Sequence, residues 1–535
     1  MKRVLVVTLV LLVTVGLGSR VAQPPAPAYD LVIRGGHVLD GAGNPWVVAD
    51  VAVTADTIAA IGPGLAGKGK REIDARGLVV SPGFIDIHTH ARRGIVDVPT
   101  ADNYVRQGVT TLFEGPDGGS PVPLKPFLDR ILTTKITPNW AMFIGQGSVR
   151  EAVMGRVNRP ATPDEIEKMK DLVRAGMREG AFGLSSGLVY VPGIFTPPAE
   201  VEALAAVAGA MGGMYQSHMR NEAAGVLDSV RETIAVGEKG RMPTQVTHHK
   251  IIGTGNWGKS VETLRLVAEA RSRGVDVTID QYPYTASATS ISVLLPPWAL
   301  EGTSAEVVAR IKDPALRAKM KPAIVESMRL ERGGGDAKNV AVSSCLWDPK
   351  LAGKNLAEIT RARGAEPTLE HAADTVLWIV EQGGAQGIFH AIDEGDLERI
   401  LRAPETMIGS DGEVVVFGHA SPHPRSYGTF VRVLGRYVRE RHVITLADAV
   451  RRMTSFPAWR AGLHDRGLLR PGMRADIAIW DADRIGDTAT YERPHQYAVG
   501  VSRVIVNGQV VFEDGHMTAA RPGRVLYGPA YATQK

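Results

Sequence analysis

The feature that most constrains the fold is an alternation of short apolar runs with helical patterns through the middle of this 535-residue chain. Short, nearly continuous apolar runs are typical of strands buried on both faces of a parallel sheet. One helical pattern begins at Thr162-Pro163-Asp164-Glu165, which supplies a cap and a first-turn proline. Seven or eight such units predict an α/β protein built as a parallel (β/α)8 barrel of the TIM type. The expected strands are 84–90, 109–113, 140–144, 183–186, 213–217, 244–247, 275–279 and 406–409.

The two ends of the chain have a different pattern. Residues 28–80 and 466–525 contain short alternating runs separated by glycine-rich turns, which indicates β-strands. We therefore expect both ends to build one small sheet domain beside the barrel, which spans residues 81–465. Within the barrel, residues 296–338 have a helical pattern without a clear strand, and we interpret this stretch as an insertion.

Polar residues end several of the expected strands, and the active site of a parallel barrel lies at these carboxyl ends. A strand directs residues i and i+2 to one face, so His88 and His90 can aim both rings at one point. A single His-x-His pair is also typical of two histidines with ordinary hydrogen bonds. Several histidine-bearing strand ends followed by an aspartate are more specific, and imidazole with carboxylate suits zinc or a similar divalent ion. The candidates are His88, His90, His218, His248 and Asp411, with Glu114 and Asp117 after the second strand.

The N-terminus predicts export. Lys2-Arg3 precede an apolar run over about residues 4–17, and small, polar and proline-rich residues follow. This order is typical of a cleavable secretory signal, here residues 1–22, and the run is short for a membrane span. We expect a periplasmic mature protein without a membrane partner; an uncleaved N-terminal anchor is the alternative. The net charge of +4 predicts no nucleic-acid partner, and Cys345, the only cysteine, cannot form an intramolecular disulfide.

Seven motifs carry a resemblance to a known family. They are Ser81–His90, Gly108–Thr111, Ser217–Glu222, Thr247–Lys250, Gly409–Gly412, His423–Phe430 and Leu468–Asp476. With them the chain resembles the amidohydrolase superfamily and, within it, the N-acyl-D-amino-acid deacylases, or D-aminoacylases. The resemblance covers about residues 28–520. It implies a (β/α)8 barrel, a β-sandwich formed from both termini and a zinc site.

The resemblance also implies roles at the metal site. His218 and His248 are then the tight ligands, while His88 and His90 bind at a second or alternative position. Asp411 is then the general base.

Recognition of a substrate carboxylate is implied for three further residues. They are Lys250, Tyr282 and Arg425, and Tyr190 is an additional pocket candidate. The sequence gives little reason to prefer Tyr282 over Tyr284.

One ligand departs from the family pattern. These deacylases carry Gly-Asn-Cys-Gly after the second strand, with the cysteine as a metal ligand, whereas this chain has Gly115-Pro116-Asp117-Gly118. The ungapped match puts Asp117 at the thiolate position, and Glu114 is the alternative. A carboxylate is harder than sulfur and can bridge two ions, so we expect one or two divalent ions, with Mn²⁺ or Co²⁺ possible beside Zn²⁺.

The predicted reaction is hydrolysis of N-acyl-D-amino acids, or related small N-acyl amino acids, to a carboxylate and a free amino acid. A divalent ion activates water and polarises the carbonyl, and Asp411 moves the proton to the leaving nitrogen. Because fold alone does not set substrate, a dipeptidase, an imidazolonepropionase-like enzyme or a lactonase on the same scaffold is the first alternative. The second alternative is an inactive exported binding protein, which would be expected to lack one of the site residues.

Overall fold

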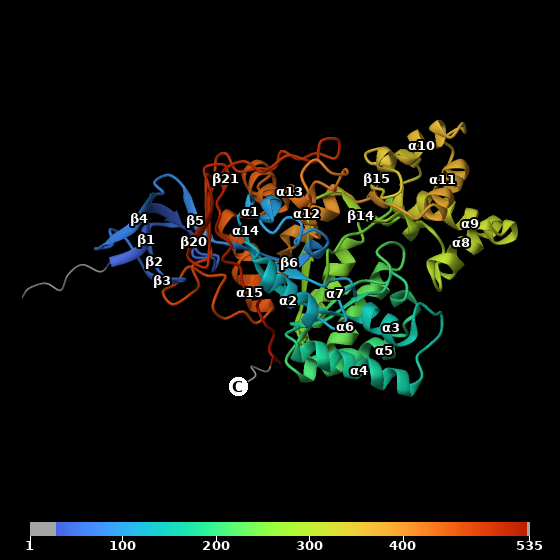
Figure 1. Cartoon of the computed structure of the whole chain (residues 1–535), viewed down its shortest axis with the longest axis horizontal. Coiled ribbons are helices and arrows are strands. Elements are labelled where there is room, and N and C mark those ends of the chain that lie inside the picture. The colour runs from blue at the N-terminus through green and yellow to red at the C-terminus, as the bar shows by residue number, and fades with distance from the viewer. Residues whose placement is uncertain (1–27, 532–535) are drawn as a thin grey trace, which may run out of the picture.

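The computed structural model describes residues 28–531, and the expected signal over residues 1–22 lies outside this range. Three parts follow one another along the long axis of the molecule (Figure 1). A β-sheet from both termini lies at one end, parallel strands and helices form the centre, and a smaller inserted unit lies at the other end. The predicted α/β class is confirmed. Within the described range, no helix is both long and apolar enough to cross a membrane.

Parallel strands form the centre of the molecule. Six strands are bonded in the order β17-β13-β12-β11-β10-β9, and three in the order β6-β7-β8. Backbone bonds from Asp411 N to His88 O (2.8 Å) and from His90 N to Gly412 O (2.7 Å) join the end of β6 to the chain after β17. Because all these neighbours are parallel, their carboxyl ends lie at one edge. The strands are β6 (Phe84–Thr89), β7 (Val109–Glu114), β8 (Asn139–Met142), β9 (Ile144–Gly145), β10 (Gly183–Gly187), β11 (Met214–His218), β12 (Thr244–Val246), β13 (Val277–Gln281) and β17 (Thr406–Ile408).

Helices connect most of these strands, and helices α3 to α7 pack against one another in chain order. The predicted cap of α4 is present, since Thr162 Oγ1 accepts from the Glu165 N–H (3.3 Å) and Glu165 Oε2 accepts from the Thr162 N–H (2.8 Å). The helices are α1 (Asp102–Val105), α2 (Lys125–Thr134), α3 (Gln146–Met154), α4 (Pro163–Arg178), α5 (Pro198–Ala210), α6 (Val226–Gly240), α7 (Ser260–Ser272), α12 (Glu394–Arg402), α13 (Arg425–Arg432), α14 (Leu446–Met453) and α15 (Ser455–Arg460).

Most central strands differ from their predicted boundaries by one residue, and the expected strand 140–144 is divided into β8 and β9. β12 ends at Val246, because His248 adopts a φ of 34° and its N–H bonds the Asp280 carboxylate (2.8 Å). β13 begins two residues later than predicted, because the Val275 N–H closes the end of α7 by bonding Ala270 O (3.1 Å).

The terminal segments share one nine-stranded sheet. β5 and β18 pair antiparallel, with Val79 opposite Trp480, and this pair joins the N-terminal to the C-terminal strands. Apolar side chains from both segments, such as Val51 and Ile477, pack in one buried cluster. The strands are β1 (Ala28–Val38), β2 (Val47–Thr54), β3 (Thr57–Gly62), β4 (Lys68–Asp74), β5 (Val79–Pro82), β18 (Ile477–Trp480), β19 (Val501–Val506), β20 (Gln509–Glu513) and β21 (His516–Met517).

The inserted unit lies between β13 and β17 in the sequence. Residues 296–338 contain α8, α9 and shorter helical turns, and the same unit also includes three antiparallel strands that the sequence did not predict. It has its own apolar core, which includes Ile324 and Leu377. Its elements are β14 (Ala286–Ser290), α8 (Ser304–Lys312), α9 (Pro314–Ser327), β15 (Val340–Ser344), α10 (Leu356–Ala362), α11 (Leu369–Glu381) and β16 (Gln386–His390).

Candidate metal centre

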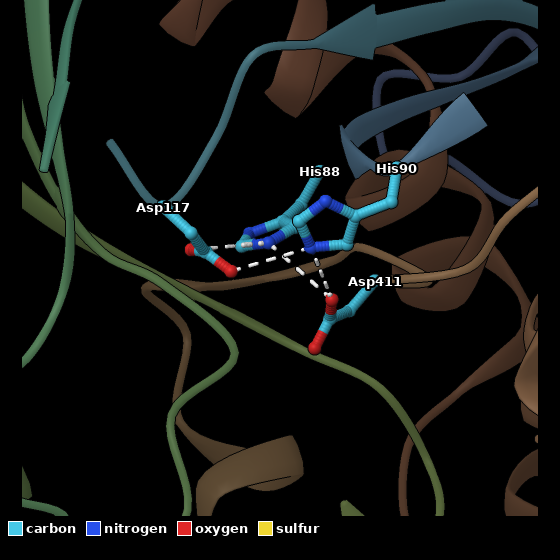
Figure 2. Close-up of side chains that lie close together, drawn as sticks. All are labelled: His88, His90, Asp117 and Asp411. Atoms are coloured by element: carbon cyan, nitrogen blue, oxygen red, sulfur yellow. Dashed lines mark ion pairs between the residues drawn. The ribbon is translucent and has the colours of Figure 1, made fainter. Parts of the chain in front are cut away.

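Six of the predicted site residues lie together at the carboxyl ends of the parallel strands. They fall into two groups that share Asp117, and within each group the candidate ligand atoms lie within 4.8 Å of one another. Figure 2 shows the first group, in which two histidine rings face two carboxylates. The first group is His88, His90, Asp117 and Asp411, and the second group is Asp117, His218 and His248.

Asp117 faces all four histidines. Its Oδ1 lies 3.5 Å from both His88 Nε2 and His248 Nε2. Its Oδ2 lies 3.3 Å from His90 Nε2 and 3.5 Å from His218 Nδ1. Each carboxylate oxygen therefore faces one histidine of each group, which is an arrangement that suits a carboxylate shared between two cations.

Glu114 lies outside both groups. This buried carboxylate accepts from the backbone N–H of Arg92 (2.9 Å) through Oε2, and Oε1 lies 3.4 Å from Arg92 Nε. Of the two carboxylates that the sequence left open, the structure brings Asp117 to the histidines and holds Glu114 on Arg92.

Three residues of the two groups have left-handed backbone. The φ angles are 54° at Asp117, 34° at His248 and 51° at Asp411. Aspartate and histidine visit this region more readily than most residues, and such strain clusters at functional sites. Neighbouring groups hold these conformations; for example, Asp280 accepts from the His248 N–H, and His88 O accepts from the Asp411 N–H.

Buried polar atoms in both groups have no hydrogen-bond partner among the described residues. They include both ring nitrogens of His88 and Asp117 Oδ1. Buried polar groups are nearly always paired in folded proteins, so these atoms require a further partner. His218 Nδ1 and His248 Nε2 also converge, 2.8 Å apart. Imidazole nitrogens and carboxylate oxygens are the usual ligands of zinc, so these residues fit one or two divalent cations.

Carboxylates control protonation in the first group. Burial opposes a charge on His90, but Asp117 and Asp411 raise the pKa of this histidine to about 9. Burial also opposes ionisation of Asp411, yet the Arg425 guanidinium and His90 hold the pKa of Asp411 well below its usual range. Arg425 Nη1 donates to Asp411 Oδ2 at 2.7 Å. Without a metal, the first group is therefore a network of ion pairs, and a cation can replace its protons.

A cavity of 320 Å³ opens beside the first group. His90, Asp117 and Asp411 of the first group line the cavity, and so do Arg425 and Tyr190. The Tyr190 hydroxyl accepts a hydrogen bond from Thr289 Oγ1 of the inserted unit (3.2 Å). A small molecule in this cavity would therefore contact both the candidate metal ligands and the inserted unit.

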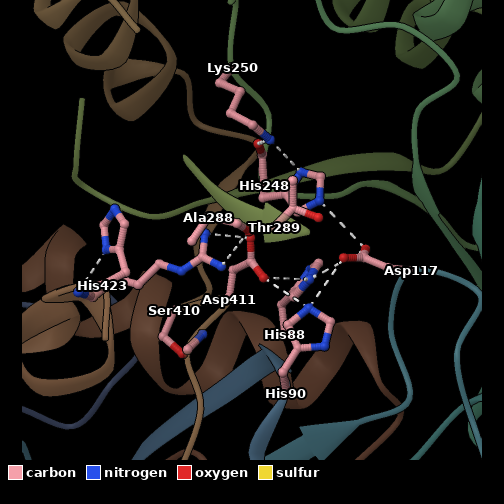
Figure 3. Close-up of polar contacts among 12 residues, drawn as sticks. His88, His90, Asp117, His248, Lys250, Ala288, Thr289, Ser410, Asp411 and His423 are labelled. Carbon is pink, nitrogen blue, oxygen red and sulfur yellow. Dashed lines mark hydrogen bonds and ion pairs between the residues drawn. The ribbon is translucent and has the colours of Figure 1, made fainter. Parts of the chain in front are cut away.

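The predicted carboxylate-binding residues meet around Tyr282. The Arg425 guanidinium lies 4.8 Å from the centre of the Tyr282 ring, and Lys250 Nζ lies 5.6 Å from it. Tyr284 instead faces Arg432, at 4.7 Å. Figure 3 shows Lys250 directed at the His248 ring. The structure thus distinguishes the two tyrosines and brings Tyr282 to Arg425 and Lys250.

Two buried carboxylates around the histidines were not among the predicted site residues. Asp280 accepts from the His248 N–H and lies 3.6 Å from His88 Nδ1, and its position at a strand end was a usable signal. Glu222 contacts His218, His248 and Lys250. It lies in a loop after β11, and no strand or helix periodicity of the sequence distinguishes it.

Parallel strands that bring histidines and aspartates together at their carboxyl ends define a metal-binding α/β protein. The amidohydrolase family model matches residues 71–512, and the chain therefore belongs to the amidohydrolase family.

Two relatives from Alcaligenes xylosoxydans xylosoxydans match nearly the whole chain. The chain is 33% identical to D-aminoacylase over 94% of its own length and 99% of that protein, and 35% identical to N-acyl-D-glutamate deacylase over 93% and 96%. A crystal structure of N-acyl-D-glutamate deacylase from Bordetella bronchiseptica, in complex with zinc and a phosphonate mimic of the tetrahedral intermediate, matches with a TM-score of 0.79. That match has 33% identity and covers 94% of this chain and all of that one.

Proposed function

We propose that the protein is a metal-dependent hydrolase that cleaves N-acyl-D-amino acids to a carboxylate and a free D-amino acid. The observation that carries the proposal is the pair of histidine groups around Asp117, next to a cavity that Arg425 also lines. The reactions named for the two relatives, D-aminoacylase and N-acyl-D-glutamate deacylase, support the same substrate class.

The donor set favours Zn²⁺, with Mn²⁺ and Co²⁺ as alternatives because oxygen replaces sulfur at Asp117. His218, His248 and Asp117 would hold one ion, and the first group would hold a second. A bound divalent ion lowers the pKa of water and polarises the substrate carbonyl.

The residues of this chain handle the proton and the substrate. Asp411 takes the proton of the attacking water and returns it to the leaving nitrogen, because it is an ionised carboxylate that lines the cavity beside His90. Arg425, Tyr282 and Lys250 lie together and would hold the substrate carboxylate, since a guanidinium can bind a carboxylate through two parallel hydrogen bonds. Tyr190 would contact the remainder of the substrate.

We further infer that the parallel strands close into a (β/α)8 barrel over residues 81–465. Two observations support closure. The chain runs directly from β8 into β9, and backbone bonds join the end of β6 to the chain after β17. The nine-stranded terminal sheet supports a β-sandwich from residues 28–80 and 466–525. We also propose export to the periplasm, on the basis of the N-terminal signal pattern.

The test is a substrate panel on purified protein that has been stripped of metal and reloaded with Zn²⁺, Mn²⁺ or Co²⁺. The panel contains N-acetyl-D- and N-acetyl-L-amino acids, dipeptides and cyclic amides, and release of the free amine is measured. We expect hydrolysis of the D series, which the Asp411→Asn variant loses. Hydrolysis of dipeptides or cyclic amides alone would assign the protein to another branch of the family.

A further inference from the structure

Glu222 stands behind the two histidines of the second group. Its side chain is buried, at 2% exposure, and its Oε1 lies 3.3 Å from His248 Nδ1. Its Oε2 lies 3.7 Å from His218 Nε2. The opposite nitrogens of the two rings, His248 Nε2 and His218 Nδ1, are the ones that face Asp117. One carboxylate therefore faces the outer nitrogen of both rings.

This position bears on the tautomers of both histidines. A neutral imidazole carries its proton on one nitrogen and a lone pair on the other. If the site-facing nitrogens are to bind a metal, His218 must carry its proton on Nε2 and His248 must carry it on Nδ1. Only an acceptor stabilises such an N–H, and Glu222 is the one carboxylate within 4.0 Å of both outer nitrogens in residues 28–531.

Lys250 opposes the tautomer that His248 requires. Its ammonium has only donor hydrogens, and Nζ lies 2.9 Å from His248 Nδ1, where it favours the tautomer that cannot bind a metal through Nε2. Glu222 Oε1 and His248 O accept from the same ammonium at 2.5 and 3.0 Å. Glu222 thus gives the lysine an alternative acceptor and holds a carboxylate oxygen 3.3 Å from His248 Nδ1, where an N–H of the required tautomer would find an acceptor.

The backbone around Glu222 is held in place. The Asn221 side chain accepts from the N–H groups of Ala223 (2.8 Å) and Gly225 (3.0 Å). Glu222 O accepts from the Ile252 N–H at 2.9 Å, which ties the loop after β11 to the segment that carries Lys250. The carboxylate is therefore presented to the histidines from a loop with little freedom to move.

We propose that Glu222 is the positioning residue of this metal centre. It fixes opposite tautomers on His218 and His248, so that both site-facing nitrogens are free to bind a metal, and it anchors Lys250. This inference rests on the proposed function, because it requires that the two histidines hold a metal. Carboxylates behind ligating histidines typically contribute about 10–100-fold to metal affinity.

The decisive experiment measures Zn²⁺ affinity of the metal-stripped full-length protein by competition with a chromogenic chelator. Glu222→Gln should bind Zn²⁺ roughly 10–100-fold more weakly than wild type. Glu232→Gln is the matched control, because Glu232 is a largely buried carboxylate of the neighbouring helix that pairs with Arg220 and contacts no histidine. The control should bind Zn²⁺ as wild type does. Equal affinity in Glu222→Gln and wild type would overturn the role of Glu222.

A second measurement uses wild-type protein and so does not depend on folding of the variant. The ¹⁵N shifts of labelled histidines in the Zn²⁺-loaded protein report which nitrogen carries the proton. We expect the proton on Nε2 of His218 and on Nδ1 of His248. The other tautomer on either ring would overturn the proposal. If wild type binds no Zn²⁺, the proposed function and this inference both fail; if it binds Zn²⁺ with the other tautomers, only the inference fails.

Discussion

The two groups that share Asp117 are built differently. The first group borders the cavity: the His90 side chain is 22% exposed, and Arg425 binds Asp411. The second group is closed off, since the side chains of His218 and His248 are at most 5% exposed and Glu222 lies behind both. The first group is thus placed to meet a substrate, and the second group is enclosed by protein.

The pKa values of the histidines also differ between the two groups. Burial and the neighbouring His248 lower the pKa of His218 to about 4, so this ring is neutral at pH 7 and offers a lone pair. Asp117 and Asp411 raise the pKa of His90 to about 9, so this ring is protonated at pH 7 in the metal-free protein. Burial and Lys250 oppose a charge on His248, but Asp117 and Glu222 raise the pKa of this histidine above its usual value. His218 of the second group can therefore bind a metal without releasing a proton, whereas His90 of the first group must release one.

The largest expected effect is loss of the second group. His218→Ala and His248→Ala each remove one of few ligands, so both variants should lose bound metal during dialysis and lose activity with it. Elemental analysis and turnover of N-acetyl-D-amino acids check this. His249→Ala is the control, because His249 Nε2 lies 2.8 Å from Thr263 Oγ1, away from both groups, and that variant should keep its metal. Metal content equal to wild type in either ligand variant would contradict the assignment.

Removal of the base should separate chemistry from metal binding. Asp411→Asn should lower turnover by about 10²–10⁴-fold, because an amide cannot accept the proton of water. Metal in the second group should be retained, since Asp411 belongs only to the first group. Steady-state kinetics and elemental analysis on the same preparation provide the test. Near wild-type turnover in this variant would show that another residue is the base.

Asp117 belongs to both groups, so its loss should weaken metal binding at both. Asp117→Ala should bind metal much more weakly than Glu114→Ala, because Glu114 bonds Arg92 and faces no histidine. Oxygen in place of sulfur should also broaden metal choice towards Mn²⁺ and Co²⁺. Metal titrations of the two stripped variants decide the matter. Tight binding in Asp117→Ala together with loss in Glu114→Ala would reverse the ligand assignment.

Substrates with and without a carboxylate can test the role of the residues beside the cavity. Arg425→Met should raise KM for N-acyl amino acids roughly 10–100-fold, the range expected for a lost charged hydrogen bond, and should change KM far less for neutral N-acyl amides. Arg432→Met is the control, because Arg432 lies on the same helix but pairs with Asp487. Lys250→Met should follow Arg425→Met if the lysine also reads the carboxylate. Equal losses on charged and neutral substrates would mean that these residues do not bind the substrate carboxylate.

Local patterns in the sequence were sufficient to predict most central strands and the six residues of the two groups. Strand alternation predicts that His88 and His90 point the same way, and barrel order predicts that His218, His248 and Asp411 meet them. These patterns predict the site because parallel strands bring their carboxyl ends together, irrespective of the conformation of the loops.

What the sequence did not predict depends on loops and on contacts distant in the chain. Glu222 reaches the histidines from an irregular loop, and the choice between Asp117 and Glu114 depends on a left-handed turn at Asp117. The strands of the inserted unit were missed because their partners are distant in the chain: Ala286 of β14 pairs with His390 of β16, and Val340 of β15 pairs with Phe389. Such pairs leave no local pattern.

The remaining effect concerns pH in the unsubstituted protein and bears directly on the difference between the groups. Burial opposes a charge on His88, but Asp117 and Asp280 raise its pKa well above the usual value, as Asp117 and Asp411 raise that of His90 to about 9. Metal binding to the first group must release these protons, so its affinity should rise by at least about tenfold per pH unit up to a pH of about 9. In the second group His218 has a pKa of about 4 and only the pKa of His248 is raised, so metal binding there should release fewer protons. Stepwise Zn²⁺ titrations of stripped protein at pH 6, 7.5 and 9 can resolve the two binding events. A weaker event that tightens steeply with pH, beside a tighter event that depends less on pH, is the expected result. Equal pH dependence of both events would mean that the two groups do not divide protonation as the metal-free structure indicates.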